Sequence, residues 1–202
     1  GVQTCALPIS PNVLVVNKNL PAHDLKSLIT LIKSKPDQLS YASSGVGTSI
    51  HLSGELFQDL TKTKMRHIPY KGRAQAIPDL LAGRVQMSFD NLTSAMPLIK
   101  SGDLKAIGVT SQQRSPHAPD IPSLSELGVP QLKNFNVTSW FSLMGPAGML
   151  KEDVAKIALE VKKILNTPET KERLLGLGLE PNPQGPQALN RLIQIEYTVR
   201  VQ

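Results

Sequence analysis

Residues 39–57 read Leu39-Ser-Tyr-Ala-Ser-Ser-Gly-Val-Gly-Thr-Ser-Ile-His-Leu-Ser-Gly-Glu-Leu-Phe57, and this stretch decides the fold. Residues 39–42 favour a short strand, and the small residues after them favour a turn. Leucines then recur every four residues from Leu52 to Leu60, as on one face of a helix, and Thr48 is a good N-terminal cap for it. A strand, a glycine-containing turn and a helix in this order are typical of α/β folds.

The turn in this stretch predicts an anion-binding site. Gly45 and Gly47 have no Cβ, so the backbone N–H groups around them can approach a ligand closely. The first N–H groups of the following helix lack partners within the helix, and the helix dipole places partial positive charge there. Such a junction suits a carboxylate or a phosphate. An ordinary strand-to-helix turn with nothing bound explains the local pattern equally well, so the pattern alone leaves both interpretations open.

Composition narrows the class of protein. The 202 residues include 22 Lys and Arg against 16 Asp and Glu, which gives a formal net charge of +6, and only 4% are aromatic. The basic residues are scattered and not interleaved with aromatic ones, so we expect no nucleic-acid partner. A mildly basic surface does suit a protein that captures anions. No run of 18 apolar residues occurs, so the sequence predicts no membrane span.

The first nine residues, Gly1 to Ile9, are unusual for a natural N-terminus. They resemble the translation of a sequencing-adapter read joined to a gene fragment, so we interpret residues 1–10 as a non-native or disordered leader. Cys5, the one cysteine of the sequence, lies within it. The rest of the chain therefore offers no disulfide, thiol nucleophile or cysteine metal site. No signal peptide is visible in the sequence.

Strand and helix patterns alternate through the first half of the chain. Apolar runs typical of strands lie at residues 11–17, 39–42, 65–70, 85–90 and 104–110, and a helical pattern follows each of the first four. Pro78 should delay the start of the third helix or kink it. The alternation predicts a parallel sheet covered on both faces, with ligands beyond the carboxyl ends of the strands. Residues 43–49, Tyr70-Lys71 and Asp90-Asn91 should then share one edge of that sheet.

The pattern changes after a β-prone run at residues 137–144. Three helical segments follow, with little strand between them. Because helices alone cannot build a sheet domain, we expect them to cover a sheet whose strands lie in other sequence.

Six short motifs occur in an order and at spacings that resemble one family of receptors. They are residues 42–57, His67-Ile-Pro-Tyr-Lys-Gly72, Phe89-Asp-Asn91, Arg114-Ser-Pro116, Ser139-Trp-Phe141 and Pro146-Ala-Gly148. Over residues 11–202 the chain resembles the extracytoplasmic solute-binding receptors of tripartite tricarboxylate transporters, the Bug family. Compared with that family, we expect the signal peptide, most of the first lobe and the end of the last helix to be missing.

The resemblance implies an α/β, periplasmic-binding-protein type II-like fold, with one complete parallel-sheet lobe and the helical remainder of the other. Residues 11–16 would form a hinge strand, 17–137 the second ligand-binding lobe, 138–144 the return hinge strand, and 145–202 the incomplete C-terminal helical part of the first lobe. The implied function is a periplasmic receptor that captures a small carboxylate and delivers it to membrane transporter subunits. We expect a monomer that needs no cofactor.

The resemblance also implies a set of ligand-binding residues: Ser43, Ser44, Gly45, Gly47, Thr48 and Ser49 in the turn, flanked by Tyr70 and Asp90. Asp90 could accept a hydrogen bond from a ligand hydroxyl, an ammonium group or a bridging water, or it could cap the helix that begins near Thr93. His51 could contact the ligand or pack within the fold, and we favour packing. The roles of Lys71 and Asn91 stay open, as does the identity of the ligand, because both lobes determine it.

Two other classes of function compete with a receptor. An enzyme would need a nucleophile from the turn, with His51 as base, but Ser49 and His51 are only two residues apart at a helix start and point in different directions. Familiar hydrolase, phosphate-loop and metalloprotease motifs are missing from the sequence, so we expect no enzyme. His67 and His117 have no neighbours at metal-ligand spacing, and we expect no metal site. A ligand-sensing domain of a regulator or two-component system stays as the alternative, since it uses a similar bilobal fold.

Overall fold

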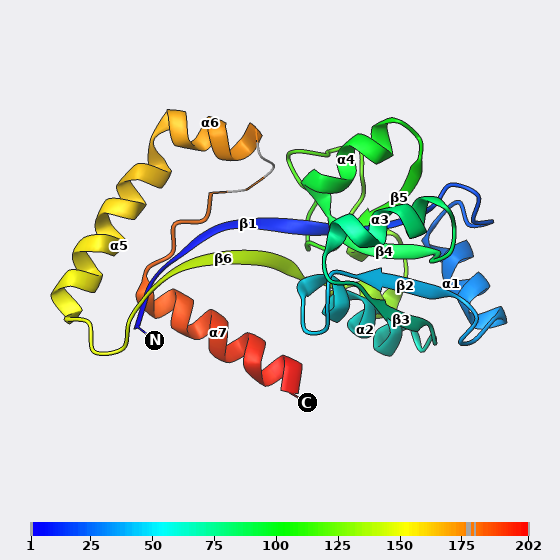
Figure 1. The fold of residues 1–202 in the computed structure, drawn as a ribbon, viewed down its shortest axis with the longest axis horizontal. Helices are drawn as coiled ribbons and strands as arrows, with labels where there is room; N and C mark the ends of the chain where they lie inside the picture. The colour runs from blue at the N-terminus through cyan, green and yellow to red at the C-terminus, as the bar shows by residue number, and fades with distance from the viewer. Residues whose placement is uncertain (1, 177–178, 180, 202) are drawn as a thin grey trace. The chain divides into compact units, whose positions relative to one another are not determined.

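A computed structural model describes residues 2–176, 179 and 181–201, and side chains within residues 10–176, 179 and 181–194. Its elements are β1 (Val2–Asn17), α1 (Leu25–Ser34), β2 (Ser40–Ser43), α2 (Ser49–Thr61), β3 (Arg66–Pro69), α3 (Arg73–Leu81), β4 (Met87–Asn91), α4 (Leu92–Lys100), β5 (Leu104–Val109), the 3-10 helices η1 (Leu124–Glu126) and η2 (Pro130–Leu132), β6 (Thr138–Gly145), α5 (Lys151–Asn166), α6 (Pro168–Gly176) and α7 (Pro186–Val201) (Figure 1).

The chain divides into two compact units. One consists of residues 11–138, which we call the sheet unit. The other, the helical unit, consists of residues 1–10 and 139–202.

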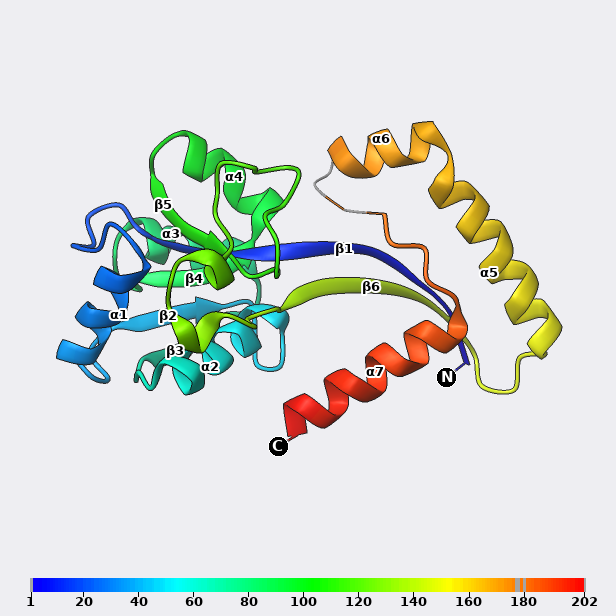
Figure 2. The same ribbon diagram turned by 180° about the vertical axis from the view of Figure 1, so that it is seen from behind.

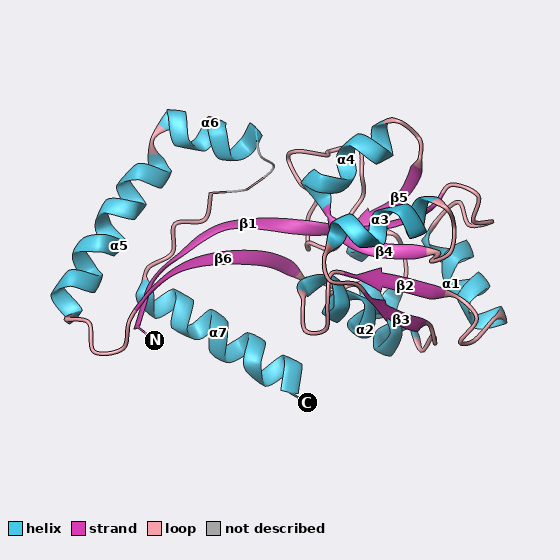
Figure 3. Ribbon diagram, viewed as in Figure 1, coloured by secondary structure: helices cyan, strands magenta, loops and turns pink. Residues whose placement is uncertain are grey.

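The sheet unit is an open mixed sheet with the strand order β3-β2-β4-β1-β5 (Figure 3). β2 runs parallel to β3 and to β4, whereas β1 runs antiparallel to both β4 and β5. The predicted α/β class is confirmed, but the expectation of an all-parallel sheet is wrong for β1. The reason is that residues 13–16 form an unbroken, fully buried apolar run. Burial on both faces requires such a run in a central strand of either direction, so the pattern could not reveal which way β1 points.

Two hydrophobic clusters cover the two faces of this sheet. Leu14 and Val16 of β1 belong to one cluster, with side chains of α1, α2 and η2. Val13 and Val15 belong to the other, with side chains of α3 and α4. Alternate residues of β1 thus point to opposite faces, as the two-residue period of a strand requires. Figure 2 shows the same layers from behind.

Local sequence sets where the helices begin. Asp24 caps α1 through a 2.7 Å hydrogen bond from the Ser27 N–H to Oδ1, and Thr48 caps α2. α3 begins at Arg73, so Pro78 does not delay its start. A proline inside a helix removes only the hydrogen bond that its own nitrogen would donate, so the first turn can form before it. Gly54 lets α2 approach β2 closely, because a Cβ there would lie 2.3 Å from Tyr41 Cε2.

In the helical unit, β6 pairs with β1 and is followed by α5, α6 and α7. Residues 2–10, which we expected to be a non-native or disordered leader, lie within β1 in the structure, and a non-native origin stays a prediction. α5 buries Val154 and Leu165 but leaves Leu159 and Ile164 more than half exposed. Among the described residues, no helix has the length and apolar content needed to cross a bilayer.

Candidate functional site

Three strands of the sheet unit, β2, β3 and β4, end at one edge of the sheet. Because β3 and β4 both run parallel to β2, the carboxyl ends of these strands meet there. The loops after β2 and β3 contain residues 44–48 and Tyr70-Lys71, and β4 ends in Asp90-Asn91 at the same edge, as the strand pattern predicts. β1 adds Asn12 from the opposite direction, since Asn12 pairs with Asn91. We call this edge the rim.

The β2–α2 loop (residues 44–48) is the part of the rim best suited to an anion. Gly45 and Gly47 have φ angles of 136° and 81°, which other residue types rarely adopt. Thr48 closes the loop, because its Oγ1 donates to the Gly45 carbonyl oxygen at 2.8 Å and accepts from the His51 N–H at 3.3 Å. The glycines and the cap together turn the chain from β2 into the first turn of α2.

Some N–H groups of this loop are used internally and others are not. The Gly45 N–H donates to Ser43 Oγ at 3.1 Å, and the Gly47 N–H donates to His51 Nδ1 at 3.2 Å. Within the described part of the chain, the Ser44 and Val46 N–H groups have no hydrogen-bond partner. Val46 is 75% exposed, so its amide is open to a ligand. A carboxylate could accept from these two groups at the positive end of the α2 dipole.

A cluster of aromatic and imidazole rings lies beside the loop. Ser43 Oγ is 2.6 Å from His67 Nε2, and His67 stacks on Tyr41 with 4.9 Å between ring centroids. His51 lies against His67 at 4.2 Å. The Tyr41 hydroxyl donates to Glu55 Oε1, and burial raises the pKa of Tyr41 well above its ordinary value. Burial also lowers the pKa of His67 from 6.5, and the neighbouring His51 lowers it further.

Sequence reasoning missed this cluster in part. It assigned His51 to packing, whereas the ring also accepts the Gly47 N–H, and it gave His67 no role. The register of β2 and β3, in which Tyr41 pairs with His67, is the signal that places the rings together. The 2.6 Å contact of Ser43 with His67 has the form of a nucleophile and its base. Ser43 is only 1% exposed, however, so a substrate could not reach it.

Asp90 is fixed by a cation that the sequence analysis did not consider. Its side chain is 2% exposed, and Arg73 Nε donates to its two oxygens at 2.8 and 3.0 Å. Burial raises the pKa of Asp90 above 3.8, and the Arg73 guanidinium offsets part of that rise. The interpretation of Asp90 as a helix cap is wrong, because Asn91 is the N-cap of α4 and the helix begins at Leu92. The Asn91 N–H instead donates to Asp90 Oδ1 at 2.9 Å.

Tyr70 connects the rim to α3. Its N–H donates to the Ser43 carbonyl oxygen at 3.0 Å, and its hydroxyl donates to Asp79 Oδ2 at 2.8 Å. Asp79 in turn accepts from Arg84 at 2.8 Å. Burial raises the pKa of Tyr70, with Asp79 as the second cause. The backbone of Tyr70 therefore adjoins the β2–α2 loop, while its hydroxyl is engaged elsewhere.

Asn91 and Asn12 form an amide pair across the rim. Asn91 Nδ2 donates to Asn12 Oδ1 at 3.1 Å, and Asn12 Nδ2 donates to Ser53 Oγ of α2 at 3.3 Å. Asn12 is completely buried, and its N–H donates to Thr110 Oγ1 at 3.0 Å after β5. The pair links β1, β4 and α2, which gives Asn91 a structural role that the sequence left open. Lys71 is exposed, and its N–H donates to Gln75 Oε1.

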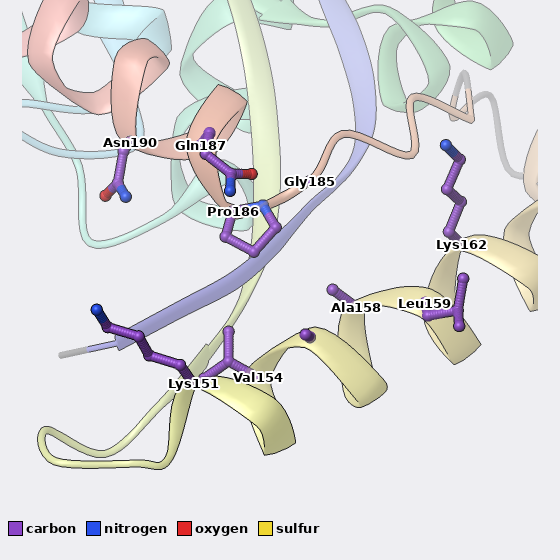
Figure 4. A pocket seen from close by; sticks show the side chains of 10 residues that line it. Lys151, Val154, Ala158, Leu159, Lys162, Gly185, Pro186, Gln187 and Asn190 are labelled. Carbon is purple, nitrogen blue, oxygen red and sulfur yellow. The ribbon is translucent and has the colours of Figure 1, made fainter.

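A hollow lies in the helical unit, between α5 and the start of α7 (Figure 4). Val154, Ala158 and Leu159 line it, with Lys151 and Lys162 at its two ends. Its wall is mostly apolar. In the described residues, no group of three or more His, Cys, Asp or Glu could hold a metal ion. The rim is therefore the stronger candidate site.

Comparison with known proteins gives one family. The sequence profile of the tripartite tricarboxylate transporter family receptors, TctC, matches residues 3–200. A protein of Pseudomonas sp. (strain P51), described as a UPF0065 protein in the tcbD-tcbE intergenic region, is 35% identical over 186 residues, which are 92% of this chain and 55% of that protein. The chain thus spans about half the length of the curated relatives it matches.

Solved structures agree with this result. The structure described as R. palustris Rpa4515 with adipate has a TM-score of 0.87 and 32% identity, covering 96% of this chain and 64% of that one. The structure of the periplasmic binding protein BugD has a TM-score of 0.83 and 30% identity, covering 96% and 65%.

Proposed function

Because the chain belongs to the tripartite tricarboxylate transporter family receptors, we propose that it is part of an extracytoplasmic receptor that captures a small carboxylate and delivers it to a transporter in the membrane. A related structure contains adipate, and another is described as a periplasmic binding protein. These relatives support a carboxylate ligand, a periplasmic location and a binding function without catalysis. We expect the receptor to act as a monomer.

The observation that supports this function most directly is the β2–α2 loop. It offers two unpartnered N–H groups at a helix start, in the part of the chain that the structure describes, and no unpaired carboxylate beside them. We propose that the Ser44 and Val46 N–H groups bind one ligand carboxylate, with Gly45 and Gly47 forming the turn that presents them and Thr48 holding the loop in shape. Since Arg73 pairs with the Asp90 carboxylate, that negative charge does not oppose an anion.

The same proposal assigns parts of the chain to a two-lobed receptor. Residues 17–137 would be the second ligand-binding lobe, between a hinge strand at 11–16 and a return strand at 138–144. Residues 145–202 would be the C-terminal helical part of the first lobe. Ser49, Tyr70 and Asp90 would border the ligand without supplying its main anchor.

Calorimetric titration with adipate tests the function, with 1,6-hexanediol as a control of the same chain length and no carboxylate. We expect adipate to bind and to be recovered unchanged, and the diol not to bind. Val46→Pro removes one proposed N–H donor, whereas Val46→Ala keeps it. A hydrogen bond to a charged group is worth about 1.5–3 kcal/mol, so Val46→Pro should weaken adipate binding about ten- to a hundredfold if the melting temperature is unchanged.

Equal affinities for the two Val46 variants would contradict the proposed anchor. Conversion of adipate to another compound would contradict a receptor function.

A further inference from the structure

We propose that His51 is a positioning residue for the β2–α2 loop, and that its protonation releases the Gly47 N–H and strengthens carboxylate binding at the rim. This inference rests on the proposed function and concerns the same site. It begins with the 3.2 Å hydrogen bond from the Gly47 N–H to His51 Nδ1.

This hydrogen bond determines which form of the His51 ring is present. Nδ1 can accept an N–H only when it bears a lone pair, so the neutral ring has its hydrogen on Nε2. In that form the Gly47 N–H is occupied by protein. Protonation places a hydrogen on Nδ1 as well, and the ring can no longer accept. The Gly47 N–H then becomes available, next to the Val46 amide that is already open.

The groups around His51 favour a proton on this ring rather than on its neighbour. His51 Nε2 is 3.8 Å from Glu55 Oε1, which stabilises an imidazolium. His67 faces His51 from β3 at 4.2 Å between ring centroids, and two charged rings so close would repel each other. Burial lowers the pKa of His67, which disfavours a proton on that ring. Tyr41 of β2 bonds the same Glu55 oxygen as a neutral phenol, and its raised pKa keeps it neutral.

Access to solvent makes this exchange of protons feasible. The His51 side chain is 17% exposed, and that of Glu55 is 50% exposed. His51 also lies in the first turn of α2, so an imidazolium there would stand beside a bound carboxylate and attract it. Protonation thus adds one donor and one positive charge to the site. Both changes favour an anion.

The test compares the pH dependence of adipate affinity in three proteins. We expect the wild-type affinity to rise as the pH falls from about 8 to about 6, by at most about tenfold per pH unit, the limit for one linked proton. His51→Gln can still accept the Gly47 N–H but does not titrate in this range. Its adipate affinity should not rise between about pH 8 and about pH 6. His51→Leu cannot accept the N–H, so its affinity should be independent of pH and above that of His51→Gln.

The slope of His51→Gln also subtracts any titration of adipate itself. An equal slope in wild type and His51→Gln would overturn this inference and leave the proposed function intact. No adipate binding at any pH would instead contradict the proposed function, and this inference with it. As a readout without ligand, the protection of the Gly47 amide against hydrogen exchange, corrected for the intrinsic exchange rate at each pH, should be lower at about pH 6 than at about pH 8 in wild type only. Exchange that changes equally in His51→Gln would also overturn the inference.

Discussion

The two sides of the rim are held in different ways. On the β2 side, neutral hydrogen bonds among residues 43–51 shape the loop, and two of its N–H groups are left without a partner in the described chain. On the β3 and β4 side, charged groups are paired across elements: Arg73 with Asp90, and Arg84 with Asp79 below Tyr70. The rim thus combines two kinds of surface. One is a neutral loop with N–H groups that suit an anion, and the other carries carboxylates that are already paired with arginines.

Arg73→Met should break the charged side and cause the largest effect. It leaves the Asp90 carboxylate buried without its cation, and breaking a buried ion pair costs about 3–5 kcal/mol. We expect the lower end, because Arg73 itself is a third exposed. Urea denaturation measures the loss. The double variant Arg73→Met/Asp90→Asn should recover much of it, and equal stabilities of the single and double variants would refute an ionic role for Arg73.

Thr48→Val, on the β2 side, should lower the free energy of unfolding by less than Arg73→Met does. It removes the hydroxyl that caps α2 and bonds the Gly45 carbonyl, and loss of such a cap costs about 0.5–2 kcal/mol. Thr48→Ser keeps the hydroxyl and serves as the control. Melts followed by circular dichroism measure stability, and titration with adipate measures affinity. If Thr48 also bonds the ligand, affinity should fall about ten- to a hundredfold. A stability equal to that of Thr48→Ser would argue against the cap.

Tyr70→Phe tests how much the Tyr70 hydroxyl contributes to stability on the β3 and β4 side. It removes one hydrogen bond to Asp79, and Arg84 still pairs with that carboxylate. We therefore expect a loss of about 0.5–1.5 kcal/mol in urea denaturation, with the adipate affinity unchanged. Arg84→Gln is the matched control for the exposed ion pair and should cost less stability than Tyr70→Phe. A large loss of adipate affinity in Tyr70→Phe would place the hydroxyl in the site.

Mild acid should have the smallest effect, through His67 of β3, which contacts Ser43 and His51 of the β2 side. The pKa of His67 is lower in the folded protein than the ordinary value of 6.5. The stability that follows from neutral His67 is present above pH 6.5 and is lost as the pH falls through the folded pKa. Asp90 acts in the opposite sense, because its raised pKa favours the folded state at and below its ordinary 3.8, and that stability is lost as the pH rises through the folded pKa. Denaturation of wild type and His67→Gln from about pH 7.5 to about pH 5 should show a decline in wild type only.

Local chemistry made part of the fold predictable. Asp24 and Thr48 predicted the starts of α1 and α2, because each N-cap residue is followed within a few residues by apolar residues at helical spacing. The direction of β1 was not predictable, because residues 13–16 are apolar for burial on both faces and not for one strand direction.

The candidate site was also predictable only in part. The loop glycines indicated an anion site, and their positive φ angles agree with the turn that was expected. Arg73 and His51 were not recognised as partners of Asp90 and Gly47, since a side-chain contact depends on how helices pack and not on spacing alone. The register of Tyr41 with His67 is a property of two paired strands, which one strand cannot reveal.

The position of β1 also has a consequence for how the chain folds. β1 lies between β4 and β5, and the Asn12 N–H reaches Thr110 Oγ1, a partner 98 positions away along the sequence. During synthesis, the two strands that flank residues 13–16 are therefore both present only after residue 109 has been made. A sheet completed by such distant contacts has a high contact order and folds slowly. Until then its central strand is exposed to aggregation, which is the state that chaperones bind.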